Sequence, residues 1–172
     1  MKLYKAKVPT IAADVIEVLV RDGDIDVAAS DRSEAEKDLV AIMEEFLRRD
    51  NELRDRARDE MAAQNIPYNE FGKTWKRIAE ETGHPTNDEV ERFLTRQFIE
   101  NMLISRFVGE VYTDDKALFK KVMIQLRVHD VDERQIREEA EGKVKNVTQG
   151  TVDYEIALQS AMRDVRKRRG LI

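Results

Sequence analysis

The longest uninterrupted helical pattern of hydrophobic positions covers residues 39–61. Its first half is apolar on a broad face, whereas its second half keeps a narrow stripe among many Arg, Asp and Glu side chains. The pattern therefore predicts a long helix, extending to about Gln64, with one buried end and one solvated end. Its apolar positions are Leu39, Val40, Ile42, Met43, Phe46 and Leu47, then Leu53, Ala57 and Met61.

Other stretches repeat this helical spacing, and Ile25 with Val27 fits a short extended segment between the first two helices. The second half of the stretch at residues 86–108 is apolar on most sides, which predicts that this helix is the most buried one. The sequence as a whole predicts an all-α protein of about six helices. The further helical stretches are residues 9–20, 68–83, 86–108, 118–144 and 154–165, the last with a stop at Gly170.

Helix-capping signals support these boundaries. Thr86 with Glu89 forms a capping box, and Ser33 with Glu36 forms a second one, although Ser30 or Asp31 are alternative caps for the long helix. A cap is also expected at residues 114–115, and a turn at residues 146–151.

Parts of the pattern recur along the chain. Superposing Gly23 on Gly109 requires an offset of 86 residues, and superposing Leu39 on Leu118 requires an offset of 79. The change in offset falls in a loop, as a duplicated unit requires. An internal duplication is therefore predicted.

Two related three-helix units are expected from this recurrence, residues 1–85 and residues 86–172, packed into one bundle or forming one continuous domain. In both units an acidic stretch, residues 50–52 and residues 130–133, separates an apolar segment from a charged one. We expect a bend or a helix break at each of these stretches.

The composition is typical of a helix-rich soluble protein. Of 172 residues, 41% are hydrophobic and 38% are charged, with 7 Gly and 3 Pro. Because the chain has no cysteine, disulfides and thiolate sites are excluded and a reducing cytoplasm is expected. Asp14 and Glu17 interrupt the first apolar run, which disfavours a signal peptide, and no run approaches the length of a membrane span.

Catalytic and metal-binding motifs are not found in the sequence. His84 and His129 lie in separate regions, and no spacing supplies carboxylate partners for a metal. Residues 22–26 resemble the start of a calcium loop, but the glycine is misplaced and Ser33 stands where the bidentate glutamate belongs. Phosphate-binding and nucleophile motifs are missing too. We therefore expect no cofactor, no metal and no enzymatic activity.

A basic cluster near the end of the chain is the least balanced charged feature. It favours the dipole at a helix C-terminus, or it contacts the phosphates of a nucleic acid or an acidic protein. Residues 1–7, which include Lys2, Tyr4 and Lys5, join this cluster if they lie nearby. Trp75 and Tyr68 belong to a core stripe or, alternating with basic residues, to a stacking surface. The cluster consists of Arg163, Arg166, Lys167, Arg168 and Arg169.

Characteristic segments at the two ends of the chain are Met1-Lys2-Leu3, Lys7-Val8, Asp22-Gly23, Asp130-Val131-Asp132-Glu133, Gly150-Thr151-Val152-Asp153-Tyr154 and the basic tail Arg166 to Gly170. In these segments the chain resembles the bacterial domain of unknown function 507 family. This resemblance implies a small helical bacterial cytosolic protein, and it implies no activity because the family offers no catalytic residues to carry over. The segment 68–105 departs from the short form of the family and fits a two-unit form.

These features together predict a non-enzymatic cytosolic adaptor that binds a protein partner or itself, without a membrane. The alternative is a nucleic-acid-associated or ribosome-associated protein that binds through the basic cluster. A third interpretation, a hydrolase, would need buried carboxylates with strongly shifted pKa values in a pocket.

Overall fold

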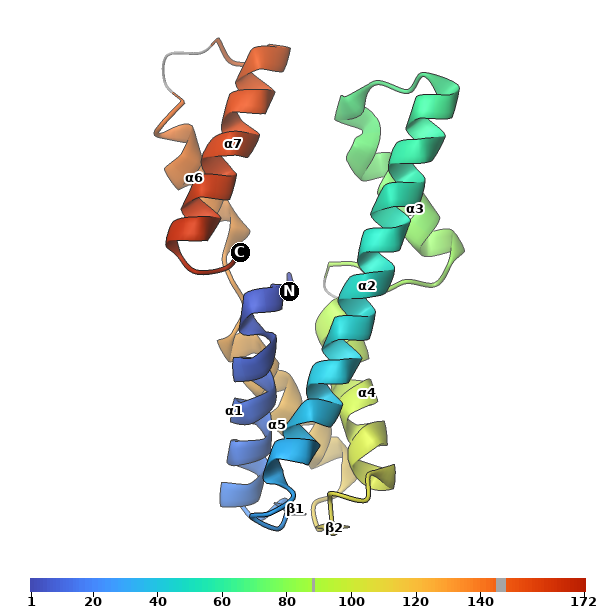
Figure 1. Ribbon diagram of the computed structural model, residues 1–172, viewed down its shortest axis with the longest axis vertical. Coiled ribbons are helices and arrows are strands. Elements are labelled where there is room, and N and C mark those ends of the chain that lie inside the picture. Colours follow the sequence, from blue (N-terminus) through green and yellow to red (C-terminus); the bar gives the residue numbers. More distant parts are fainter. Residues whose placement is uncertain (88, 145–147) are drawn as a thin grey trace.

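The computed structural model describes residues 1–87, 89–144 and 148–172 and confirms an all-α fold (Figure 1). Two short strands and two 3₁₀ turns, Lys5–Lys7 and Tyr68–Glu70, accompany the helices. The described helices are α1 (Val8–Arg21), α2 (Arg32–Gln64), α3 (Phe71–Glu81), α4 (Glu89–Ile104), α5 (Asp115–Val128), α6 (Glu133–Glu141) and α7 (Val152–Arg168). The strands are β1 (Ile25–Asp26) and β2 (Glu110–Val111).

Four helices form a stem in the lower half of Figure 1. Helix α1 packs on α2, α2 on α4, α4 on α5, and α5 on α1, which closes a ring around one core. Because Leu39, Phe98 and Leu118 are fully buried there, each contributes about 1.5–3 kcal/mol through burial of apolar surface. The stem core draws residues from both predicted units, 1–85 and 86–172.

The two strands close the far end of the stem. They pair antiparallel, with Ile25 opposite Val111. Beside them, the buried carboxylate of Asp24 accepts hydrogen bonds from Lys121 Nζ, at 2.6 Å, and from the Thr113 hydroxyl. Burial raises the pKa of Asp24, but these hydrogen bonds outweigh burial and lower the pKa overall. Asp24 therefore joins the two halves of the stem.

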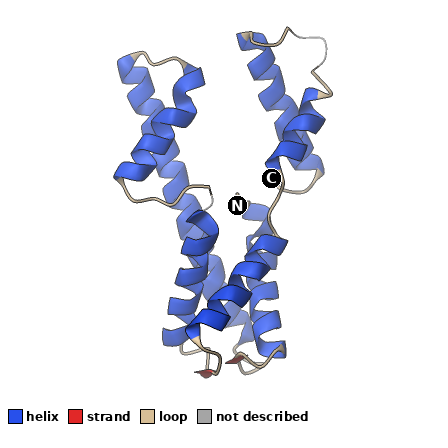
Figure 2. Cartoon of the chain, turned by 180° about the vertical axis from the view of Figure 1, so that it is seen from behind, coloured by secondary structure: helices blue, strands red, loops and turns tan. Residues whose placement is uncertain are grey.

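Two arms extend from the stem and give the molecule the shape of a fork (Figures 1 and 2). Arm 1 is the second half of α2 with α3, and its small core contains Ala57, Met61 and Ile78. Arm 2 is the α6–α7 hairpin, with a separate core around Ile136 and Leu158. Neither α6 nor α7 packs extensively on a helix of the stem.

The predicted break at residues 50–52 is wrong, because α2 continues without interruption through 33 residues. The break at residues 130–133 is confirmed, since α5 ends at Val128 and α6 begins at Glu133. Local helix propensity explains the difference. Residues 128–132 are five consecutive weak helix formers, each costing about 0.5 kcal/mol relative to Ala, whereas residues 50–52 contain only two.

Some predicted burial is also wrong. Leu103 and Ile104, which we expected in the most buried helix, are 56% and 83% exposed because α4 ends there at the edge of the stem. Tyr68 is 74% exposed, since it lies in a 3₁₀ turn before α3 rather than on its buried face. Ile156 lies on the face of α7 opposite its core and is exposed too.

The capping predictions are partly confirmed. The Glu89 carboxylate accepts a hydrogen bond from the Thr86 backbone N–H at 3.3 Å, and Asp114 caps α5. The Ser33 capping box is wrong, because α2 begins at Arg32 and Asp31 occupies the N-cap position, so that Ser33 lies inside the first turn of the helix. The first residues of the predicted turn 146–151 lie outside the described residues, and Thr151 caps α7.

The order helix, strand, helix occurs twice in the stem, as α1–β1–α2 and as α4–β2–α5. The two strands from these segments pair with each other. Descent of the two halves from one duplicated unit stays a prediction.

Candidate protein-binding cleft

A cleft of about 1040 Å³ lies between the two arms. One wall comes from arm 1, with Arg54 and Trp75, and the other comes from arm 2, with Arg134 and Arg166. Residues 1–5 and the linker 130–132 form its base. The cleft is therefore a place where three distant parts of the sequence meet.

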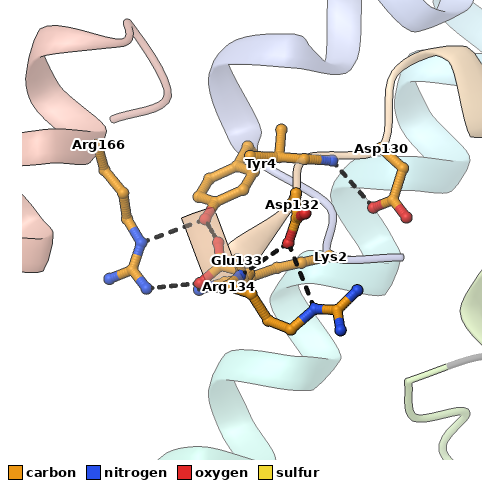
Figure 3. Close-up of polar contacts among 8 residues, drawn as sticks. Lys2, Tyr4, Asp130, Asp132, Glu133, Arg134 and Arg166 are labelled. Atoms are coloured by element: carbon orange, nitrogen blue, oxygen red, sulfur yellow. Dashed lines mark hydrogen bonds and ion pairs between the residues drawn. The ribbon is translucent and has the colours of Figure 1, made fainter. Parts of the chain in front are cut away.

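Three side chains converge on Glu133 in this cleft, and we call these four residues the Glu133 cluster (Figure 3). Arg166 Nη2 lies 2.7 Å from Glu133 Oε2, and Lys2 Nζ lies 3.4 Å from the same oxygen. The Tyr4 hydroxyl donates to Glu133 and accepts a hydrogen bond from Arg166 Nε at 3.2 Å. Burial lowers the pKa of Lys2, and Glu133 partly opposes this effect.

Local structure explains how Glu133 and Arg166 meet. The Asp132 carboxylate accepts a hydrogen bond from the Arg134 backbone N–H at 2.9 Å, which starts α6 and places Glu133 in its first turn. Arg166 lies in the last turn of α7, which packs on α6. An acid at a helix N-terminus and a base at a helix C-terminus both complement the helix dipoles. Sequence reasoning missed Glu133, although its position after the Asp132 cap signals a helix start.

At the arm 1 wall and next to it, side chains also pair with one another. Arg54 Nε lies 2.7 Å from Asp50 Oδ2, and the Arg54 guanidinium stacks on Trp75 with 4.5 Å to the ring centroid. His84 Nε2 lies 3.4 Å from Asp50 Oδ1, and its ring stacks on Phe46. Burial lowers the pKa of His84, with Asp50 opposing. Asp50 thus connects α2 with the loop that follows α3.

Trp75 and Tyr68 do not form one stacking surface. Trp75 is half-buried and covered by Arg54, whereas Tyr68 stacks on Phe71 at the tip of arm 1.

The predicted basic cluster is divided among three environments. Arg166 belongs to the Glu133 cluster, and both Arg168 and Arg169 pair with Glu139 of α6. Arg163 and Lys167 are exposed and make no ion pair within the described ranges. Lys2 and Tyr4 join Arg166, as expected if residues 1–7 lie nearby. Phosphate binding by the cluster stays a prediction.

The two histidines lie apart in the structure. His129 Nε2 lies 3.0 Å from Asp14 Oδ2 near the end of α5, and His84 lies at the base of arm 1. Within the part of the chain that the structure describes, no group of three or more His, Asp or Glu side chains is arranged to hold a metal. No described helix combines the length and hydrophobicity that crossing a membrane requires.

The family model described as "Protein of unknown function (DUF507)" matches residues 1–171, and so takes in both arms, the stem and the Glu133 cluster. The chain belongs to the DUF507 family. The resemblance noted at both ends of the sequence is thereby confirmed across almost the whole DUF507 chain. Comparison with curated proteins found no match.

Proposed function

We propose that this chain is a non-enzymatic interaction protein of the bacterial cytoplasm that holds a protein partner between its two arms. One observation carries the proposal: an open cleft of about 1040 Å³ has walls from both arms and a base from residues 1–5 and 130–132. A partner seated there contacts three parts of the chain at once. Two pairs of helices that diverge as a fork present side chains to a partner from both sides of the cleft.

Two carboxylates outside the cleft, Glu45 and Glu91, do not have the ionisation of a general acid. A general acid needs a carboxyl with a raised pKa. Hydrogen bonds from Arg48 and Arg49 instead lower the pKa of Glu45 to about 2, and a hydrogen bond from Arg127 lowers the pKa of Glu91. These shifts favour ion pairing over proton transfer.

Charge supports a protein partner over nucleic acid. The chain has a net charge of −5, so the molecule as a whole repels phosphate. Three of the five basic residues near its end, Arg166, Arg168 and Arg169, already pair with glutamates. Binding of RNA or DNA would first have to break these pairs.

Site-specific photo-crosslinking tests the proposal. A photoreactive amino acid is placed at Asn51 on arm 1, at Ile172 beside arm 2, or at Lys120 on the outside of α5, in cells of the native host. We expect the same protein to be crosslinked from Asn51 and Ile172 but not from Lys120. Equal crosslinking from Lys120, or no crosslinking from the two cleft positions, would contradict the proposal. Light scattering shows whether the partner is a second copy.

The nucleic-acid alternative is tested by a gel shift at low salt. Salt-dependent binding of RNA or DNA that is lost when Arg163 and Lys167 are replaced by Ala would favour this alternative. The variant Glu139→Gln releases Arg168 and Arg169, so it would strengthen such binding. We expect no shift for the unmodified chain.

A further inference from the structure

We propose that the cleft binds an acidic segment of a partner protein, and that a carboxylate of this segment replaces Glu133 on Arg166, Tyr4 and Lys2. This inference rests on the proposed function and names the chemistry of the partner. It follows from three features of the cleft: its charge, the arrangement of donors around Glu133, and the weak attachment of arm 2.

The acidic side chains of the cleft are already engaged. Asp50 pairs with Arg54, the Asp130 carboxylate accepts from the Val131 N–H at 3.0 Å, and Asp132 caps α6. The basic residue Arg134 is 91% exposed, and its Nε lies 3.8 Å from Asp132 Oδ1.

Lys5 is a further basic residue of the cleft. It is exposed at the base of the cleft and makes no ion pair within the described residues. Five basic side chains in the lining (Lys2, Lys5, Arg54, Arg134, Arg166) outnumber four acidic ones (Asp50, Asp130, Asp132, Glu133), so the cleft has an excess of one positive charge, although the chain as a whole is acidic. An acidic segment complements this local charge.

The donors around Glu133 have the arrangement of a carboxylate receptor. An arginine from α7 and a phenol and an ammonium group from residues 1–5 point at one carboxylate, and arginine is the side chain best suited to bind it. The Glu133 side chain is 31% exposed, so solvent and a competing carboxylate can reach it. Glu133 thus occupies a site that an equivalent group from outside can take.

Arm 2 is attached to the rest of the chain by few contacts, so a ligand can be accommodated beside it. Helices α6 and α7 have their own core, to which Tyr4 is the contribution from the N-terminal segment. Residues 129–132 between α5 and α6 are not helical. Release of Glu133 therefore removes its contacts with Lys2 and Tyr4, while the hydrogen bond from Arg166 to Tyr4 keeps arm 2 next to residues 1–5, where the ligand carboxylate binds.

Fluorescence anisotropy with labelled peptides tests the inference. The probe is a Glu/Ala peptide of about 20 residues, and its uncharged control is the matching Gln/Ala peptide. We expect the unmodified protein to prefer the Glu peptide and Arg166→Gln to weaken that binding about thirtyfold or more, as for loss of a buried charge partner. We expect Glu133→Gln to strengthen it by about fivefold, because the internal competitor is removed.

Matched variants separate this exchange from a general effect of charge. Glu139→Gln changes the net charge by the same amount as Glu133→Gln, but it releases Arg168 and Arg169 outside the cleft. We expect Glu139→Gln to leave binding of the Glu peptide within about twofold of the unmodified protein. Equal strengthening by the two variants would overturn the inference.

Loss of peptide binding can also be distinguished from unfolding of a variant. Lys2→Gln removes a donor that is 44% exposed, so it should fold normally and weaken binding of the Glu peptide by about threefold, which keeps the test valid if Arg166→Gln unfolds arm 2. Equal binding of the Glu and Gln peptides would overturn the inference. If crosslinking from Asn51 and Ile172 still captures a shared partner in that case, the proposed function stands without it.

Discussion

The two arms leave the stem in different ways. Arm 1 continues a stem helix, α2, so its direction is fixed by an unbroken hydrogen-bonded backbone. Arm 2 follows a break after α5 and is held to residues 1–5 by the Glu133 cluster. The arm 1 wall of the cleft is therefore part of a rigid helix, whereas a few polar contacts set the position of the arm 2 wall.

A small difference in sequence separates the continuous helix of arm 1 from the helix break before arm 2. The stretches to compare are residues 50–54 and residues 130–134. Both stretches are acidic, and both have an arginine four residues after the first aspartate, Arg54 and Arg134. The Arg54 pair forms inside a helix, whereas Arg134 follows the Asp132 cap that starts a new one. Similar charge patterns therefore support a continuous helix or a hinge, depending on the residues beside them.

Proline should destabilise the protein much more within residues 50–52 than within residues 130–133. In the interior of α2, Asn51→Pro removes a backbone hydrogen bond and should lower the free energy of unfolding by about 3 kcal/mol or more. Asp132→Pro should cost about 1 kcal/mol, for the lost cap, because the φ of −71° at Asp132 suits proline. Urea unfolding measures both, and equal losses would show that residues 129–132 do not act as a hinge.

Truncation of buried leucines should show how far each core extends. Leu158→Ala in arm 2 should cost about 3 kcal/mol, and hydrogen exchange should rise in α6 and α7 alone. Leu118→Ala in the stem should cost a similar amount but raise exchange in all four stem helices. Increased exchange of α1 in Leu158→Ala would contradict an independent arm 2.

Tyr4→Phe should loosen arm 2 with a smaller effect on stability. It removes the hydroxyl that links Arg166 and Glu133, at a cost of about 1 kcal/mol. Because the chain has no native cysteine, spin labels at Ser160 and Lys116 report on arm 2, and labels at Asp59 and Lys116 report on arm 1. We expect the first distance distribution to widen in Tyr4→Phe and the second to stay unchanged.

Acidification should lower the free energy of unfolding through His84, where arm 1 joins the stem, and this effect should be smaller than those of the substitutions above. Because burial holds the pKa of His84 below its ordinary value, the unfolded chain takes up the proton first. The free energy of unfolding should therefore fall as the pH drops below about 6.5, and it should keep falling down to the pKa of the folded state. His84→Gln should flatten this dependence in urea unfolding between pH 7.5 and 5.5. An unchanged slope would show that His84 does not cause it.

Much of the fold could be predicted from the sequence because helices depend on local spacing. The apolar stripe of residues 39–61 and the Asp114 cap both act within a few residues, so the end of α2 at Gln64 and the start of α5 followed from them. The break after α5 follows from weak helix formers next to each other, and it was expected. The same expectation failed for α2 because charge alone does not end a helix.

The cleft was decided by tertiary structure. The sequence identified Arg166 as part of a basic cluster, but only packing of α6 on α7 brought it to Glu133, and only the return of residues 1–5 added Tyr4 and Lys2. These partners are separated by up to 162 residues, and no local pattern encodes which distant charges meet. The sequence by itself determined the helices and their caps, because those interactions are local. The arrangement of the arms, and the charge available between them, came from contacts between distant segments.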